Sequence, residues 1–116
     1  MDIVVRSVPD RSKNKLSIIK SIDSEKSLEE IARMLGLEAE EVIEEMENIV
    51  YSGTRLNIDY MLEELDVDEE VIEDIYDYFR QSKTDSIETA LDELDESYLE
   101  EDIRLVRIKF LSELAI

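Results

Sequence analysis

The chain has 116 residues, of which 13 are Lys or Arg and 32 are Asp or Glu, so its net charge is −19. It contains no Cys and no His, which excludes disulfides, thiolate metal sites, Cys nucleophiles and the commonest general base. Hydrophobic residues make up 43% of the chain, too many for an acidic disordered tail, while Gly (2) and Pro (1) are rare. We therefore expect a compact all-α domain.

The charge is distributed unevenly along the chain. Residues 1–26 carry six basic and four acidic side chains, residues 27–103 carry four and 27, and residues 104–116 carry three and one. The negative charge thus belongs to the middle, and both ends are mildly basic. A strongly negative protein is a poor ligand for a phosphate backbone. The sequence also lacks an apolar run long enough for a membrane span or a secretion signal, so we expect a cytoplasmic protein without membrane contact.

The N-terminal part predicts an irregular segment followed by a helix. Residues 1–12, which include Pro9, are expected to be a lead-in or a linker from domains further upstream. Apolar residues then recur at helical spacing over residues 13–22, with Lys13 and Lys20 on the opposite side of the helix.

The next segment has the pattern of a helix-turn-helix. Ser27 and Glu30 have the spacing of a capping box, which opens a helix that Gly36 ends in a left-handed conformation. A further amphipathic helix follows over residues 39–51. Two such helices joined by a short turn with Gly form a helix-turn-helix, and the helix before them completes a three-helix core over residues 13–53. A plain helical hairpin fits the same spacing.

Residues 54–116 predict a C-terminal helical subdomain, which gives six to seven helices in all and a single helical domain over residues 13–116. The residues expected to open its helices are Asn57, Asp66 or Asp68, Asp85 with Glu88, and Ser97 with Glu100. In the last helix, the residues expected to face inward are Leu99, Ile103, Val106, Phe110 and Leu114. Glu100 precedes Arg104 by four residues, the favourable order for a helical ion pair.

The second helix of a helix-turn-helix would read the major groove, and here its outer face is acidic. The residues predicted on that face are Glu40, Glu41, Glu44, Glu45 and Glu47. Phosphates would repel such a face before it could reach a base edge, so we do not expect this helix to read DNA. The basic residues that remain as candidates for contact with nucleic acid or a partner are Arg11, Lys13, Lys15, Lys20 and Arg55.

The many carboxylates do not select a metal or catalytic site. Residues 66–70 faintly resemble the start of a calcium loop, but they lack its Gly and lead into a helix-forming segment. No nucleophile and no phosphate-binding loop accompanies any pair of acids. We expect no catalytic residue, no cofactor site and no metal site in this chain.

Several segments together resemble one family of domains. The segments are Ser27 to Leu37, Ile49 to Gly53, Leu56 to Asp59, Tyr51 to Tyr60, Asp102 to Ile108 and Ile103 to Leu114. In order and spacing they resemble the C-terminal helix-turn-helix domain of bacterial RecQ-type DNA helicases, over about residues 13–115. The resemblance implies a larger parent, an ATP-dependent helicase that unwinds DNA with three-prime-to-five-prime polarity in recombination and repair, associated with the nucleoid.

The resemblance also implies where the cofactor and metal sites of the parent enzyme lie. ATP, Mg and Zn would be bound by parts of the parent upstream of this chain, and Met1 is then not expected to be the natural N-terminus. Three hypotheses for the chain follow. It is a non-catalytic accessory domain that helps to position DNA or docks a partner. Alternatively, it is an acidic module that binds a basic protein or mimics DNA in the helicase's own channel. In the third, it is a free-standing acidic helical protein such as an anti-repressor.

Overall fold

The computed structural model describes residues 11–114, which form seven helices and no strand. The helices are α1 (Arg11–Asp23), α2 (Leu28–Leu35), α3 (Ala39–Tyr51), α4 (Asp59–Glu63), α5 (Glu69–Gln81), α6 (Ile87–Glu93) and α7 (Glu100–Leu114). The predicted all-α class with a helix-turn-helix core is therefore confirmed. The expected lead-in falls mostly outside the described residues, and α1 begins at Arg11, two residues earlier than predicted.

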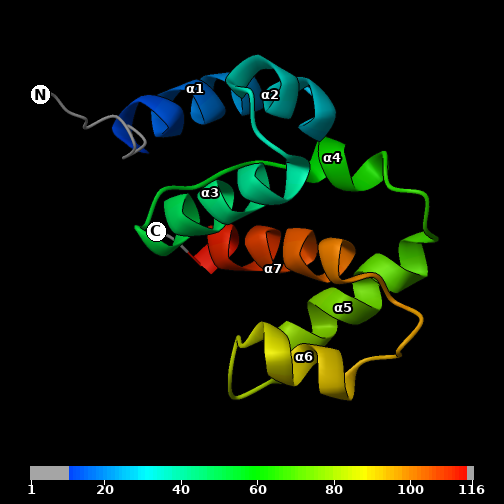
Figure 1. The fold of residues 1–116 in the computed structure, drawn as a ribbon. Coiled ribbons are helices and arrows are strands. Elements are labelled where there is room, and N and C mark those ends of the chain that lie inside the picture. The colour runs from blue at the N-terminus through cyan, green and yellow to red at the C-terminus, as the bar shows by residue number, and fades with distance from the viewer. Residues whose placement is uncertain (1–10, 115–116) are drawn as a thin grey trace, which may run out of the picture.

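The helices stack in layers around two parallel central helices (Figure 1). α1 and α2 lie on one side of α3, and α7 lies on the opposite side of it. α5 and α6 then pack beneath α7, and the short α4 lies beside the stack near the N-terminal ends of α3 and α7. Because α3 and α7 are both covered on two sides, they form the centre of the molecule.

The core runs continuously through these layers. Its fully buried side chains come from α1, α2, α3, α5, α7 and the link before α4, and they include Ile18, Ile31, Ile43, Met46, Ile58, Ile75, Ile103 and Ile108. Each such side chain stabilises the fold by about 1.5–3 kcal/mol relative to its exposure in water. No boundary in the packing therefore separates the helix-turn-helix from the C-terminal helices.

Several predicted helix ends are confirmed and others are wrong. Asp68 occupies the N-cap position of α5, as expected, although its side chain makes no capping hydrogen bond. Ser86 caps α6 in place of the predicted Asp85, because the hydroxyl of Ser86 accepts the Thr89 N–H at 3.3 Å. The capping box at Ser97 does not form, because this residue bonds to Asp95 instead and α7 begins only at Glu100.

The inward face of α7 was predicted correctly only in its middle. Ile103 and Val106 are buried and Phe110 is half-buried against the core. Leu99 and Leu114 are 63% and 60% exposed, because they lie at the two ends of the helix, beyond the helices that cover it.

Candidate functional site

The helix-turn-helix forms from local signals in the sequence. The Ser27 hydroxyl accepts the Glu30 N–H at 3.1 Å, and the Glu30 carboxylate accepts the Ser27 N–H at 3.0 Å. This capping box starts α2, and the second bond holds the pKa of Glu30 below its ordinary value. Gly36 ends α2 with φ +69°, and the next residue, Leu37, packs against the core between α2 and α3.

α7 covers the side of α3 that faces away from α1 and α2 (Figure 1). In a helix-turn-helix that reads DNA, the second helix must enter the major groove while the first helix crosses the backbone. In this chain α7 packs along α3, and α5 and α6 extend the molecule further on the same side. A binding partner can therefore reach only the part of the α3 surface that α7 leaves uncovered.

The contact between α3 and α7 centres on a cluster of three charged residues that are largely buried. Arg104 donates two hydrogen bonds to the Glu47 carboxylate, from Nη2 at 2.7 Å and from Nε at 3.1 Å. Arg107 Nη2 donates a third at 2.6 Å. The side chains of Glu47, Arg104 and Arg107 are only 11%, 12% and 9% exposed. The bonds to Glu47 raise the pKa of Arg104, so this guanidinium stays charged.

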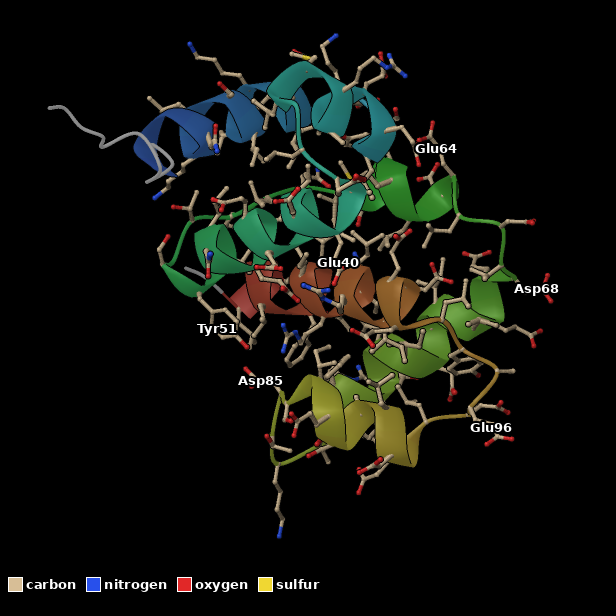
Figure 2. The ribbon with its side chains drawn as sticks, viewed as in Figure 1. Glu40, Tyr51, Glu64, Asp68, Asp85 and Glu96 are labelled. Atoms are coloured by element: carbon tan, nitrogen blue, oxygen red, sulfur yellow. The ribbon has the colours of Figure 1, made fainter. Side chains whose placement is uncertain are left out.

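Arg107 also connects α7 to the segment that opens α6. Its Nη1 donates to the backbone carbonyl of Asp85 at 2.9 Å, and its guanidinium lies 5.6 Å from the ring centre of Tyr51. Figure 2 shows Tyr51 and Asp85 on neighbouring parts of the surface, at the C-terminal end of α3. Arg107 Nε is buried and has no hydrogen-bond partner among the described residues. One side chain therefore joins three helices.

The acidic face predicted for α3 is present, with one correction. Glu40, Glu41 and Glu44 are exposed and Glu45 is half-buried, but Glu47 is buried at 8% exposure. The prediction for Glu47 was wrong because its position on the helix lies under α7, whose two arginines compensate its charge.

The structure describes the side chains of three of the five predicted basic candidates, Lys15, Lys20 and Arg55. The side chains of Arg11 and Lys13 lie outside the described part of the structure. Lys15 is half-buried on α1, where its Nζ donates to Ser52 Oγ at 3.5 Å, next to the C-terminal end of α3. Lys20 is exposed on α1.

The fifth candidate, Arg55, is exposed in the link after α3. It lines a hollow of about 400 Å³ that also contains acidic residues, among them Asp23 and Glu113. Arg55 thus faces acids of its own chain, and α1 is the described helix that offers the candidate lysines.

The basic residues of the last helix are neutralised internally, which the sequence did not indicate. Lys109 Nζ donates to Asp59 at 2.7 Å and to Glu113 at 2.8 Å. Although burial opposes protonation, these two bonds raise the pKa of Lys109 above its ordinary value. Together with the pairing of Arg104 and Arg107, this means that every Lys and Arg of residues 104–114 is paired with an acid of the same chain.

No metal site or membrane-spanning helix is found among residues 11–114. Their Asp and Glu side chains form no group of three that could hold a metal ion. None of their helices combines the length and apolar character that crossing a bilayer requires. The acids of residues 66–70 precede and open α5, where negative charge favours the helix start.

Comparison with protein families identifies one segment of the chain. Residues 12–62 match the family described as RecQ-1-like, helix-turn-helix domain. The segment contains nearly all of α1, then α2, α3 and most of α4, so the predicted resemblance to a RecQ-type helix-turn-helix domain is confirmed over these residues. The search of curated proteins found no significant match.

Proposed function

We propose that this chain is a non-catalytic accessory domain of an ATP-dependent RecQ-like DNA helicase, acting in recombination and repair at the bacterial nucleoid. In this proposal ATP, Mg and Zn are bound elsewhere in the parent enzyme. The family match of residues 12–62 supports the parent. The domain assists by docking and by weak contact with the DNA backbone, and it does not read base sequence.

One observation carries this choice of mechanism. α7 packs on the side of α3 away from α1 and α2, and the exposed charged residues that remain on α3 are all acidic. Sequence reading in the major groove depends on donors such as Arg, Lys, Asn and Gln held near phosphates by further basic residues. α3 contains no Arg or Lys and its one amide residue is Asn48. Two features therefore disfavour reading of the DNA major groove by α3: α7 covers one of its sides, and its exposed charges are negative.

Backbone contact is assigned to α1 in this proposal. Lys15 and Lys20 lie on α1, and Arg11 and Lys13 precede them on the same helix. Lysines that neutralise phosphates release counterions, so the affinity they give falls steeply with salt. A contact of a few lysines on a protein of net charge −19 is expected to be weak and detectable only at low salt.

A titration of labelled forked DNA at low salt tests the proposal. We expect weak binding that a Lys15→Gln, Lys20→Gln double variant reduces by about five-fold or more, since two phosphate contacts are lost. Lys83→Gln is the control, because Lys83 is exposed in the link between α5 and α6, at the far end of the stack from α1. Absence of binding at low salt removes the DNA contact and leaves docking alone.

Mimicry of phosphate is the second candidate function, and the ion pairs made by the basic residues of α7 favour it. Because Arg104, Arg107 and Lys109 are bound to acids of the core and its edge, they do not offset the exposed acids of α5 and α6. If the chain occupies a helicase's DNA channel, adding it in excess to a RecQ helicase core should weaken DNA binding, increasingly at low salt. Unchanged DNA affinity would exclude the mimic.

A further inference from the structure

Tyr51 differs from the other tyrosines that the structure describes. It is 54% exposed, whereas Tyr60, Tyr76, Tyr78 and Tyr98 are half-buried and each donates its hydroxyl to an acceptor of the chain. Figure 2 shows Tyr51 at the edge of the molecule, at the C-terminal end of α3. Within residues 11–114, its ring is therefore the one aromatic surface that is mostly open to solvent.

Arg107 holds the Tyr51 ring in place. Its guanidinium lies 5.6 Å from the ring centre, within the range of a cation–π contact. Arg107 is itself fixed, because Nη2 donates to Glu47 at 2.6 Å and Nη1 donates to the Asp85 carbonyl at 2.9 Å. A ring with a rigid neighbour loses little conformational freedom on binding, so Tyr51 is preorganised for a further contact.

The basic helix α1 begins at the same end of the molecule. Lys15 Nζ lies 3.5 Å from Ser52 Oγ, and Ser52 is the residue that follows Tyr51. Figure 1 shows that α1 starts where α3 and α7 end, and α1 contains four basic residues and one acidic residue. The acid beside Tyr51 in Figure 2 is Asp85, which comes from the segment before α6. An anion is therefore favoured on the α1 side of the ring.

An open aromatic ring next to lysines is a combination typical of proteins that bind single-stranded nucleic acid. Bases stack on such rings largely regardless of sequence, because every base has a π face, while the lysines contact phosphates. In a duplex the neighbouring base pairs cover these faces, so the ring favours unpaired bases. Lys is depleted at interfaces between proteins, so its presence here favours nucleic acid over a protein partner.

We propose that Tyr51 is a stacking platform for an unpaired DNA base, with Lys15 on the adjoining phosphate. The inference rests on the DNA contact proposed above and extends it, because contact with the backbone alone does not distinguish a single strand from a duplex. The domain then binds a single-stranded tail more tightly than a blunt duplex. This preference depends on Tyr51, whereas the affinity for both forms of DNA depends on the lysines of α1.

Fluorescence anisotropy at low salt tests the preference with the intact chain. The probes are a labelled single-stranded oligonucleotide and a labelled blunt hairpin duplex with the same number of phosphates. Tyr51→Leu should weaken binding of the single strand about five-fold or more, because stacking is lost, and change binding of the duplex by less than about two-fold. Tyr51→Phe keeps the ring and should bind both probes as the native chain does.

The matched control removes an apolar side chain elsewhere. Leu99 is 63% exposed at the start of α7, at the opposite end of this helix from Tyr51, so Leu99→Ala should bind both probes as the native chain does. Replacement of one base of the single strand by 2-aminopurine gives a direct signal of stacking. Its fluorescence should fall when the native chain binds and should not fall with saturating Tyr51→Leu, whose folding is checked by circular dichroism.

The outcomes separate this inference from the proposed function. Equal affinity for single strand and duplex, unchanged in Tyr51→Leu, would overturn the stacking platform and leave the backbone contact of α1 in place. No binding of either probe at low salt would overturn both DNA contacts. If sedimentation shows that the chain associates with itself and that Tyr51→Leu abolishes this, the ring is a contact between copies and its assignment to DNA is wrong.

Discussion

Glu47 is the residue on which the junction of α3 and α7 most depends. Its carboxylate accepts three hydrogen bonds from two arginines that are themselves about nine-tenths buried. We expect Glu47→Gln to lower the free energy of unfolding by about 3–5 kcal/mol, because it leaves buried cations without compensation. Urea denaturation followed by circular dichroism measures this. Glu44→Gln, one turn earlier and exposed, should change it by less than about 0.5 kcal/mol. Similar effects of the two substitutions would contradict the stabilising role of the cluster of Glu47, Arg104 and Arg107.

Tyr60 makes the stability of the protein sensitive to alkaline pH. Its hydroxyl donates to the Lys26 carbonyl at 2.6 Å, and burial raises its pKa to about 12. Since this pKa lies above that of the unfolded chain, the contribution of Tyr60 is fully present below pH 10 and is lost as the pH rises toward 12. Tyr60→Phe should cost about 1 kcal/mol at neutral pH and flatten the alkaline decline. Thermal denaturation between pH 8 and pH 11 tests both effects, and an unchanged decline would assign it to other tyrosines.

At this scale, the sequence could reveal which residues are acidic but not which of them are compensated. The pattern of α3 places Glu47 away from the apolar stripe, at the edge of the acidic face. Its partners Arg104 and Arg107 lie 57 and 60 residues further along the chain. A helical period describes one helix and carries no information on what packs against its edge. The nearby pair of Glu100 and Arg104 was predictable from spacing, yet it is the weaker contact at 4.0 Å.

Among the elements, the turn between α2 and α3 is the one set most directly by a single residue. Gly36 has φ +69°, and a Cβ placed there would meet no atom within 4 Å. Gly36→Ala should therefore destabilise the protein through backbone strain alone, by about 1–2 kcal/mol. Gly36→Asn is the control, since Asn tolerates the left-handed region and should cost less. Comparison of the melting temperatures of the two variants tests whether backbone strain at residue 36 is the cause. Equal melting temperatures would mean that the turn adjusts freely.

Helix starts were predictable only in part: the lone candidate Asn57 before α4 was wrong, because Ile58 is the N-cap there, whereas a complete capping box can mark the start correctly. Ser27 with Glu30 is such a case, and both of its hydrogen bonds form. Before α6, Asp85 and Ser86 are adjacent candidates, and the structure uses Ser86. Before α7, Ser97 turns back to Asp95, so its side chain is not available as a cap. Neighbouring polar residues compete for the same backbone donors, and the tertiary position of the helix decides which of them succeeds.

For the whole molecule, the packing predicts that the matched family segment does not fold by itself. Residues 12–62 contain α3 without α7, so Ile43 would lose its cover and Glu47 its partners. A fragment of residues 11–62 should show helical signal without a cooperative thermal transition, whereas the complete chain shows one. Dispersed amide resonances in the fragment, with a cooperative transition, would show that the C-terminal helices are dispensable for folding.

The net charge of −19 acts against the compact state as a whole. Exposed acids lie on nearly every described helix, while several of the bases are paired with acids in the core or at its edge. Raising NaCl from about 20 mM to 0.5 M shortens the screening length from about 20 Å to about 4 Å, which weakens the repulsion between exposed acids but hardly affects the buried cluster at Glu47. We therefore expect the melting temperature to rise by about 5 °C, equivalent to about 1 kcal/mol.

Scanning calorimetry over a series of salt concentrations measures this rise. Glu44→Gln, Glu73→Gln removes two exposed charges that lie beyond the first turns of α3 and α5, so this variant should melt higher at low salt and gain less from added NaCl. Sodium sulfate would confuse the result, because it also strengthens apolar burial, so NaCl is the salt of choice. If the melting temperature falls as NaCl increases, exposed ion pairs such as Lys109 with Asp59 stabilise the fold more than the repulsion among its acids weakens it.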